Sequence, residues 1–388
     1  MYRVIGERDL TETSLDAGAV RALLRDVVRA RVFDDRALAL QRRGWMSGYP
    51  PYRGQEGSQV AAAHAMREAD WLFPTYRTNA MALARGVPMS DVLLFRRGYP
   101  EFVSDHDVRI FPQAVPIATQ LPHAVGVGMA VNYRNAVAPA GPDDAAGGGT
   151  DEADGKAGAD GAVAAGLVDP TDGPTDEAVV AYLGDGATSE GDTHEAMNFA
   201  GVFGAPVLFL CENNGWAIST PREHQTAADS IAARAGAYGF EGRQVDGTDP
   251  LAVHEVVAEA LATVREGTPV LVESLVHRHG PHTTSDDPSR YEDRASVPEW
   301  RRRDPLDRLA TFARERGLVG EGVVETLRED ARREADEAVA TAEATAPPAV
   351  ADLFEHSYAD LPPRVREQHA WLRERADDVE PGGPAWED

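Results

Sequence analysis

The stretch AVVAYLGDGATSEGD, residues 178–192, joins a short apolar run to an acidic residue that stands between two glycines. An apolar run of this length, ending at turn residues, is typical of a buried strand. By itself, Gly184-Asp185-Gly186 predicts only a tight turn, because Asp and Gly are common turn residues. The residues that follow decide whether the Asp185 carboxylate has a further role.

A helix and a second strand are predicted directly after the glycines. The helix is expected to begin at Asp192 or Thr193 as its N-cap. Its apolar face is expected to contain Met197, Phe199, Val202 and Phe203. A second apolar run, PVLFLCENN at residues 206–214, then ends at polar side chains. Strand, helix and strand in this order form a βαβ unit, whose two strands are parallel.

Parallel pairing brings Asp185 and Asn214 to the same place. Parallel strands end at one edge of a sheet, and ligands bind at that edge in open α/β sheets. Two oxygen donors suit Mg²⁺, which completes its coordination with phosphate oxygens. The free N–H groups of a helix start suit the phosphate itself. The stretch therefore predicts an α/β fold with a site for a metal-bound phosphate group.

The same residues resemble a known family. Gly184-Asp185-Gly186, then 26 residues, then Asn213-Asn214 is similar to the signature of thiamine-diphosphate enzymes. EGDTHEAMNFAGVFGAPVLFLCENNGWAISTP more narrowly resembles the alpha subunit of the decarboxylating component of 2-oxo acid dehydrogenase complexes. Further blocks in the family's order are QRRGWMSGYPPYRGQEG (41–57), PTYRTNA (74–80), PIATQLPHAVG (116–126), VDGTD (245–249), HRHGPHTTSDDPSRY (277–291) and DLFEHSYADLPPRVREQ (352–368).

The resemblance implies an α/β thiamine-diphosphate-binding fold, with a mostly parallel sheet flanked by helices on both faces and a helical C-terminal region. We expect a helical N-terminal segment at residues 1–44, the diphosphate-binding domain at 45–300 and the helical region at 301–388. Residues 138–177 are rich in Gly, Ala, Asp and Pro and lack aromatic residues. That composition predicts an acidic, disordered insertion within the domain.

The resemblance also implies the cofactors, thiamine diphosphate and Mg²⁺, and the residues that hold them. Asp185 and Asn214 match the family's Mg²⁺ ligands, together with the backbone carbonyl of Trp216. Backbone N–H groups of Gly186 and Ala187 are expected at the diphosphate. Thr119 and Gln120 lie at positions where some relatives bind a structural monovalent cation.

Four more residues receive roles from the resemblance. Tyr76 and Arg77 match the pair that holds the diphosphate, and a guanidinium suits phosphate because its planar fork donates in parallel. Ile117 matches the bulky residue that props the cofactor into its bent shape, although core packing explains it equally well. His282 matches the catalytic histidine that contacts the diphosphate and assists acyl transfer to a lipoyl arm, chemistry that suits an imidazole.

Several features leave alternatives open. His277, His279 and His282 with Asp286 and Asp287 form a rival zinc-site hypothesis, and Arg278 is expected to pair with Asp286. Glu292 replaces the arginine that usually follows Tyr291, which puts loop docking in question. Glu212 stands where animal branched-chain relatives carry a phosphate-binding arginine, so weaker anchoring of the diphosphate is expected.

Composition excludes several classes of protein. The chain has 388 residues and a net charge of −26, and Lys156 is its single lysine. Such an acidic surface repels nucleic acid and anionic lipid. It tolerates high salt, where the Debye length falls to about 3 Å at 1 M, so we interpret it as adaptation to a salty cytoplasm. No membrane span or signal peptide is predicted, and Cys211 reads as a buried, inert thiol.

Two further helices are predicted from apolar spacing. Residues 14–43 are expected to begin at Ser14 as N-cap, with a core stripe of Val20, Leu23, Leu24, Val27 and Val28. Residues 122–133 are expected to form a helix in which Gly126 and Gly128 allow close packing.

The chain is expected to supply half of an active site. In the family, the acid that activates the cofactor's pyrimidine belongs to a beta subunit, so Glu56 is expected to be a buried salt-bridged or capping residue. The resemblance implies an α₂β₂ assembly docked on a lipoyl-bearing acyltransferase core. The substrate is expected to be a small 2-oxo acid, and TSDD after His282 favours the branched-chain (2-oxoisovalerate) type. Pyruvate and acetoin dehydrogenase alpha subunits, and an inactive assembly or regulatory paralogue, are the alternatives; a stand-alone decarboxylase is disfavoured by length.

Overall fold

The computed structural model describes residues 1–113, 115–137, 176–354 and 356–375. Its centre is a five-stranded sheet in the order β1-β2-β3-β7-β6, and all four strand pairings are parallel. The strands are β1 (Trp71–Phe73), β2 (Val179–Gly184), β3 (Val207–Asn213), β6 (Glu241–Asp246) and β7 (Val270–Leu275). β4 (Trp216–Ala217) and β5 (Thr220–Pro221) form a separate antiparallel hairpin. The α/β fold with a mostly parallel sheet is confirmed.

The two predicted strands pair as the βαβ unit requires. β2 and β3 are adjacent, with Gly184 opposite Glu212 at their carboxyl ends. Every residue of β3 is buried, as expected for a parallel strand covered on both faces. Asp185 and Asn214 therefore follow neighbouring strands at one edge of the sheet.

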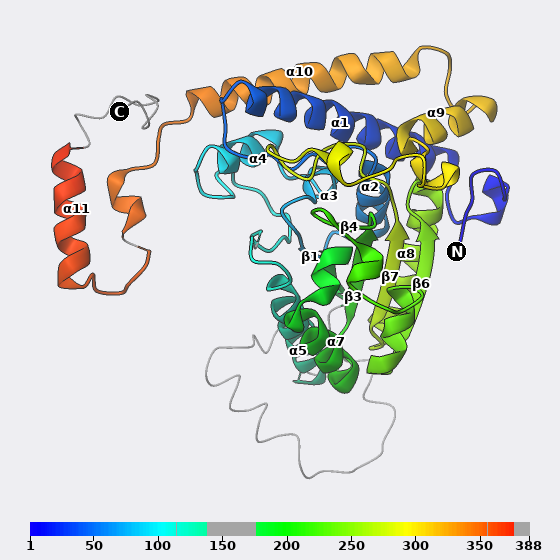
Figure 1. Cartoon of the computed structure of the whole chain (residues 1–388), viewed down its shortest axis with the longest axis horizontal. Coiled ribbons are helices and arrows are strands. Elements are labelled where there is room, and N and C mark those ends of the chain that lie inside the picture. The colour runs from blue at the N-terminus through cyan, green and yellow to red at the C-terminus, as the bar shows by residue number, and fades with distance from the viewer. Residues whose placement is uncertain (114, 138–175, 355, 376–388) are drawn as a thin grey trace, which may run out of the picture.

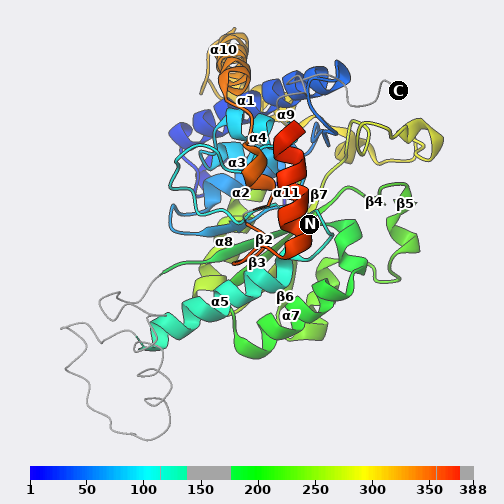
Figure 2. The ribbon, with the colours of Figure 1, turned by 90° about the vertical axis from the view of Figure 1, so that its left-hand side faces the viewer.

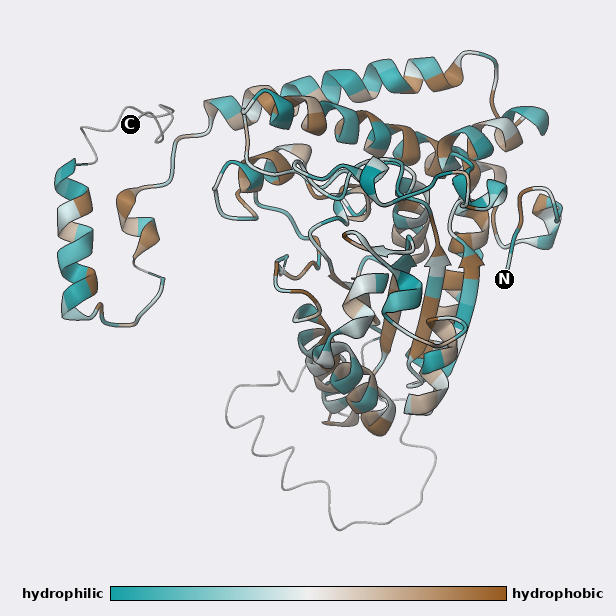
Figure 3. Cartoon of the chain, in the orientation of Figure 1, coloured by the Kyte–Doolittle hydropathy of each residue, from teal (hydrophilic) through white to brown (hydrophobic). Residues whose placement is uncertain are grey.

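Alternate strand residues build two separate cores. Val180, Tyr182, Leu208 and Leu210 belong to one core, whereas Val179, Leu183, Val207 and Phe209 belong to the other. This alternation follows from the two-residue side-chain period of a strand. Figure 3 shows β3 and β7 in brown at the centre of the molecule, with α10 and α11 largely teal.

Helices cover both faces of the sheet, as predicted (Figures 1 and 2). The first core includes residues of α1 (Ala17–Arg42), α2 (Glu56–Ala65), α3 (Asn79–Ala84), α4 (Met89–Arg96), α8 (Pro250–Arg265), α9 (Pro305–Glu315) and α10 (Val323–Ala344). The second includes residues of α5 (Gln120–Val137), α7 (Gly191–Phe203) and the 3-10 helix η5 (Ala232–Tyr238). α1 and α10 lie side by side along one edge of the molecule.

The N-terminal helix matches its predicted range but not its predicted cap. Asp16, not Ser14, caps α1, because its side chain accepts from the backbone N–H of Ala19. The hydroxyl of Ser14 is instead bonded to Glu255 in α8. The predicted core stripe of α1 is buried throughout.

α7 departs from prediction at its start and on its surface. Its N-cap is Glu190, which makes no side-chain capping bond, so Asp192 and Thr193 lie inside the helix. Met197 is buried, but Phe199, Val202 and Phe203 are 46%, 69% and 49% exposed. The apolar residues lie on two sides of α7, and the small residues Ala196 and Ala200 share the buried side with Met197.

The predicted helix at residues 122–133 is longer at both ends in α5. At Gly128, an added Cβ would lie 2.9 Å from Val207 Cγ2, so the predicted close packing is confirmed there. Gly126 has open space around it, so for this residue the packing interpretation is wrong.

The helical C-terminal region is confirmed by α9, α10 and α11 (Pro363–Arg375). α11 stands apart from the main body in Figure 1. Most of the predicted insertion, residues 138–175, lies outside the described residues. The three-part division of the chain stays a prediction. Among the described residues, none of the helices combines the length and apolar character that crossing a bilayer requires.

Candidate functional site

A cavity of about 670 Å³ lies at the carboxyl ends of β2 and β3. It contains every residue predicted to hold thiamine diphosphate or Mg²⁺, although these come from distant parts of the sequence. Its lining includes Tyr76, Arg77, Ile117, Asp185, Asn214 and His282, and also Gly186, Ala187 and Trp216. The predicted site residues therefore share one cavity.

Asp185 is a buried carboxylate at the tip of β2. Its residue is 2% exposed, and its Oδ1 accepts from the backbone N–H of Asn214 at 3.3 Å. Its Oδ2 is buried and has no hydrogen-bond partner in the described part of the chain. Burial raises the pKa of Asp185 to about 7, although Arg301 acts in the opposite direction. A buried carboxylate oxygen without a partner is costly, and a cation beside it would remove that cost.

Asn214 and Trp216 supply the other expected metal ligands from the turn after β3. Asn214 Oδ1 accepts from the backbone N–H of Trp216 at 3.1 Å. One carboxylate, one amide oxygen and a backbone carbonyl are hard oxygen donors, the kind that Mg²⁺ prefers. The donor set fits Mg²⁺ with a phosphate completing the coordination.

Gly186, in the turn after β2, leaves no room for a side chain. Residues Asp185–Ser189 form the 3-10 helix η3. At Gly186, a Cβ would lie 2.7 Å from Ala217 Cβ, so glycine is required for η3 to approach the β4–β5 hairpin. Gly186 and Ala187 both line the cavity.

Arg77 is a buried cation held by neutral groups. It is 6% exposed and donates to the carbonyl of Pro51 at 2.6 Å. It also donates to the carbonyl of His282 at 2.8 Å and to His282 Nδ1 at 3.1 Å. Burial lowers the pKa of Arg77 from its usual value. A buried guanidinium in a cavity fits an anionic ligand such as diphosphate.

His282 lies between two guanidinium groups. Arg278 approaches the same Nδ1 at 3.4 Å, and guanidinium groups only donate, so Nδ1 is the unprotonated nitrogen. Burial, Arg77 and Arg278 lower the pKa of His282 to about 4. The imidazole is therefore neutral near pH 7 in the protein without ligands.

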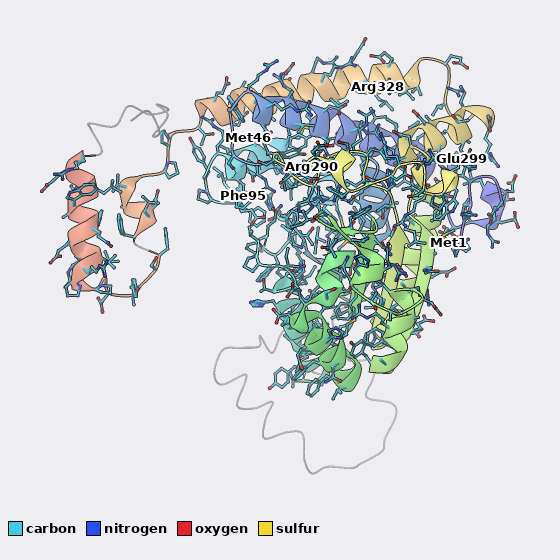
Figure 4. All side chains as sticks on the ribbon, viewed as in Figure 1. Met1, Met46, Phe95, Arg290, Glu299 and Arg328 are labelled. Carbon is cyan, nitrogen blue, oxygen red and sulfur yellow. The ribbon has the colours of Figure 1, made fainter. Side chains whose placement is uncertain are left out.

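The segment that carries His282 is tied down by polar contacts (Figure 4, where Arg290 marks it). Asp286 Oδ2 accepts from the backbone N–H of His282 at 2.5 Å and from the Tyr291 hydroxyl at 2.7 Å. The predicted Arg278–Asp286 pair is present at 3.8 Å. Glu292, the departure from the family pattern, lies 3.5 Å from His277 Nδ1. Glu292 Oε1 is buried and makes no hydrogen bond in the described part of the chain, so this approach does not replace a docking contact.

Three other predictions have clear outcomes. The zinc hypothesis is wrong, because no three His, Cys, Asp or Glu side chains within the described ranges converge as metal ligands. Glu56 is fully buried and paired with Arg31, as expected. Cys211 is a buried free thiol, also as expected.

The monovalent-cation site stays a prediction. Thr119 Oγ1 donates to the carbonyl of Pro116 at 2.9 Å, and Gln120 Nε2 donates to the carbonyl of Tyr182 at 2.8 Å.

The cavity also contains residues for which no role was predicted. Gln55 and Arg96 line it, and Arg96 donates to the carbonyl of Tyr76 at 2.9 Å. Gln55 stands in RGQEG, one of the resembling blocks, so its block was a usable signal. Arg96 ends a helix outside the resembling blocks and carried none.

Glu212 was noted in the sequence only as a departure from the family pattern. It lies in the cavity wall and is 3% exposed. Burial raises the pKa of Glu212 to about 7, against the lowering effects of Tyr182, Gln59 and Gln55.

A buried carboxylate and a buried guanidinium lie in one cavity at the carboxyl edge of the parallel sheet. This arrangement is typical of an α/β enzyme whose ligand is anionic and associated with a metal ion. Comparison with known proteins makes the class specific. Residues 25–351 match the family model described as the dehydrogenase E1 component. The chain belongs to this family and is a thiamine-diphosphate-dependent oxidoreductase, the E1 alpha component of a 2-oxo acid dehydrogenase.

Individual relatives cover nearly the whole chain. The 3-methyl-2-oxobutanoate dehydrogenase subunit alpha of Mycobacterium tuberculosis (strain CDC 1551 / Oshkosh) is 39% identical, over 94% of this chain and 88% of the relative. The pyruvate dehydrogenase E1 component subunit alpha of Bacillus cereus is 34% identical, over 96% and 90%. Its counterpart in Staphylococcus aureus (strain Mu50 / ATCC 700699) is 34% identical, over 91% and 86%.

Proposed function

We propose that this chain holds the diphosphate end of thiamine diphosphate in the cavity at the carboxyl edge of the sheet. Asp185, Asn214 and the carbonyl of Trp216 would hold Mg²⁺, and Arg77 with Tyr76 would hold the diphosphate. The observation that carries this proposal is the buried Asp185 Oδ2 without a partner, in the same cavity as a buried guanidinium. When bound, the cofactor supplies the electron sink that decarboxylation of a 2-oxo acid requires.

Ile117 and the backbone after β2 would fix the position of the cofactor. Ile117 is 42% exposed and lines the cavity, which fits a side chain that supports a ligand better than one that fills a core. Gly186 and Ala187 would donate backbone N–H groups to phosphate oxygens, since they begin the turn that leads to α7.

His282 is the proposed catalytic residue. Its Nδ1 accepts from Arg77 and Arg278, so its Nε2 carries the proton that a reacting oxygen or sulfur atom could receive. A diphosphate near Arg77 would offset the positive charge that now lowers the pKa of His282. This geometry supports the role of a proton donor in acyl transfer to a lipoyl arm.

The substrate is proposed to be a branched-chain 2-oxo acid of the 2-oxoisovalerate type. The support is the 39% identity to the Mycobacterium tuberculosis 3-methyl-2-oxobutanoate dehydrogenase subunit, against 34% to the pyruvate dehydrogenase subunits. Pyruvate is the second candidate because those relatives cover as much of the chain. Acetoin has no such support among these relatives.

The proposed assembly is an α₂β₂ heterotetramer that delivers acyl groups to a lipoyl-bearing core. Alpha subunits of this family typically work with a beta subunit. An inactive paralogue is disfavoured because Asp185, Asn214, Arg77 and His282 are all present in the cavity. A cytoplasmic location and adaptation to high salt stay predictions.

The test combines the chain with a beta-subunit candidate from the same genome. Reduction of an artificial acceptor would be measured in molar salt with Mg²⁺ and thiamine diphosphate, offering 3-methyl-2-oxobutanoate, pyruvate and acetoin in turn. We expect activity in the mixture only, with the highest rate for 3-methyl-2-oxobutanoate. Activity of the chain alone would overturn the half-site proposal, and a higher rate with pyruvate would overturn the substrate assignment.

A pair of arginine variants tests the cofactor site directly. Arg77→Met should weaken thiamine diphosphate binding by roughly tenfold or more, because a charged hydrogen bond to phosphate is lost. Arg85→Met is the matched control: Arg85 is also partly buried, and it donates to the carbonyls of Arg67, Glu68 and Asp70 outside the cavity. Equal losses in both variants, measured by titration calorimetry, would contradict the assignment of Arg77.

A further inference from the structure

The amide of Asn214 has two different ends, and only one of them can bind a cation. Its oxygen, Oδ1, accepts from the backbone N–H of Trp216 at 3.1 Å, and its second lone pair remains for a metal. Its nitrogen, Nδ2, donates to Gln55 Oε1 at 3.2 Å. A reversed amide would point N–H groups at the metal site and would repel the ion.

The orientation of Gln55 determines the orientation of Asn214. Gln55 must present its oxygen to Asn214 if Asn214 is to present its nitrogen to Gln55. Gln55 is 1% exposed, so solvent does not satisfy the reversed arrangement. The amide of Gln55 therefore needs an acceptor at its other end.

Glu212 is that acceptor. Its Oε2 accepts from Gln55 Nε2 at 2.5 Å and from Gln59 Nε2 at 3.2 Å. An oxygen that faces two NH₂ groups acts as an acceptor, whereas an amide in its place could be an acceptor or a donor. The carboxylate of Glu212 therefore determines which end of the Gln55 amide, and through it of the Asn214 amide, faces each neighbour.

We propose that Glu212 and Gln55 form a relay that holds the oxygen of the Asn214 amide toward the Mg²⁺ site. Glu212 and Gln55 are positioning residues in this arrangement, because they act on the metal through Asn214. The relay deepens the proposed function, since it rests on Asn214 as a metal ligand. It also gives Glu212 a role, although the sequence had marked this residue only as a departure from the family pattern.

Loss of the relay is expected to lower metal affinity more than any other property of the site. Residues that orient metal ligands typically contribute about 10-fold to 100-fold in metal affinity. The Trp216 N–H also holds Asn214 Oδ1, so part of the orientation survives without the relay. We therefore expect changes near the lower end of that range.

The test measures Mn²⁺ binding by electron paramagnetic resonance of the free ion, with the alpha and beta chains assembled and thiamine diphosphate saturating. Glu212→Gln should weaken Mn²⁺ binding about tenfold, since a carboxylate accepts with both of its oxygens whereas an amide accepts with only one of its two ends. Gln55→Leu should weaken it similarly, because Asn214 Nδ2 loses its acceptor. Thiamine diphosphate affinity at saturating Mn²⁺ should change much less.

Gln59→Leu is the matched control. Gln59 is fully buried and bonds to the same Oε2 of Glu212, and its other described bond is to the carbonyl of Arg77 at 3.2 Å. Because Gln59 does not bond to Asn214, its loss should lower stability but leave Mn²⁺ affinity within about twofold. A purely structural role for the cluster would give all three single variants the same Mn²⁺ affinity.

The exchanged pair Gln55→Glu with Glu212→Gln provides the rescue. A carboxylate at position 55 would accept from both neighbours, so Asn214 would again present its nitrogen to an acceptor and its oxygen to the metal. Mn²⁺ affinity should return to within about threefold of the wild type. Failure of this rescue, or unchanged affinity in Glu212→Gln, would overturn the relay. Failure of the wild-type protein to bind Mn²⁺ and thiamine diphosphate would overturn the proposed function instead.

Discussion

Asp34 is a buried carboxyl group that does not take part in the proposed chemistry. It is 2% exposed and accepts from the Tyr49 hydroxyl at 2.9 Å and from the backbone N–H of Tyr52 at 3.1 Å. Burial raises the pKa of Asp34 to about 7, and the nearby charges of Glu56 and Asp35 act in the same direction. Asp34 thereby connects α1 to the segment that leads into α2.

The pKa of Asp34 predicts a pH-dependent stability. The folded protein binds the Asp34 proton more tightly than the unfolded chain does, so this contribution is complete below about pH 4 and is lost as pH rises through about 7. Asp34→Asn cannot lose a proton. The free energy of unfolding of the variant relative to wild type should therefore rise by roughly 2 kcal/mol between pH 5 and pH 8. Urea unfolding at both pH values measures this difference.

The control for this prediction is Asp35→Asn. The Asp35 side chain is 57% exposed, so its variant should show no comparable change of relative stability with pH. If both variants respond to pH in the same way, the burial of Asp34 is not the cause.

The sequence predicted which residues lie together where a strand ended at a polar residue. Asp185 and Asn214 follow apolar runs, so parallel pairing placed them together without further information. Arg77 and His282 are 205 positions apart, and only the family resemblance united them. Arg96 was missed as a site residue because its contacts arise from tertiary packing, which leaves no periodic signal in the sequence, whereas Gln55 stands in a resembling block that could have indicated it.

The β4–β5 hairpin contains a strained residue at the cavity. Ile218, in the two-residue turn of this hairpin, has a φ of +58°, a left-handed conformation that β-branched residues rarely adopt. It is 56% exposed and lines the cavity. Backbone strain of this kind concentrates at ligand sites, so the hairpin gives up stability to place an apolar side chain there.

Ile218→Asn should raise the free energy of unfolding by about 1 kcal/mol, because Asn tolerates the left-handed conformation. Little burial is lost, since the side chain is already exposed. Thermal unfolding of the chain without cofactor measures the change.

Ile218→Val is the comparison for the Asn variant, as it keeps the β-branch and hence the strain. The explanation by strain would be rejected if the Asn and Val variants were equally stable.

Elements were predicted more securely than their ends. The 3.6-residue spacing of apolar residues located α1 and α5, but the cap of α1 depended on which of Ser14 and Asp16 found another partner. Glu255, 241 positions away from Ser14, decided this, and no local pattern reports it. The same spacing wrongly placed the outer apolar residues of α7 in the core of the chain. An apolar side chain on a helix predicts burial, but the pattern does not distinguish the core from an interface with another chain.

At the scale of the whole molecule, that outer face is the α7 patch, made of Phe199, Val202 and Phe203. Phe199 and Phe203 stack with ring centroids 5.7 Å apart, and all three side chains are exposed. α7 follows η3, whose residues line the cavity. The patch is at the C-terminal end of α7, which leads back to the start of β3. A contiguous exposed apolar patch marks an interaction surface, and we predict that the beta subunit of the proposed assembly is its partner.

The double variant Phe199→Ser with Phe203→Ser should abolish or weaken assembly with the beta subunit at least tenfold. The isolated chain should keep its stability within about 0.5 kcal/mol, since exposed substitutions cost little. Sedimentation velocity of the mixture measures assembly, and urea unfolding measures stability. Trp371→Ser on α11, where Trp371 is 58% exposed, is the control; undiminished assembly of the α7 variant would contradict the prediction.

The direction of β2 has a practical consequence. The strand begins just after Asp176 and ends at Gly184 beside the cavity, and six residues of strand span roughly 20 Å. The described chain ends at Val137 and resumes at Asp176. Asp176 therefore lies at the end of the sheet opposite the cavity. A fluorescent label or affinity tag inserted between Val137 and Asp176 would therefore report on assembly and turnover without contacting the cofactor site.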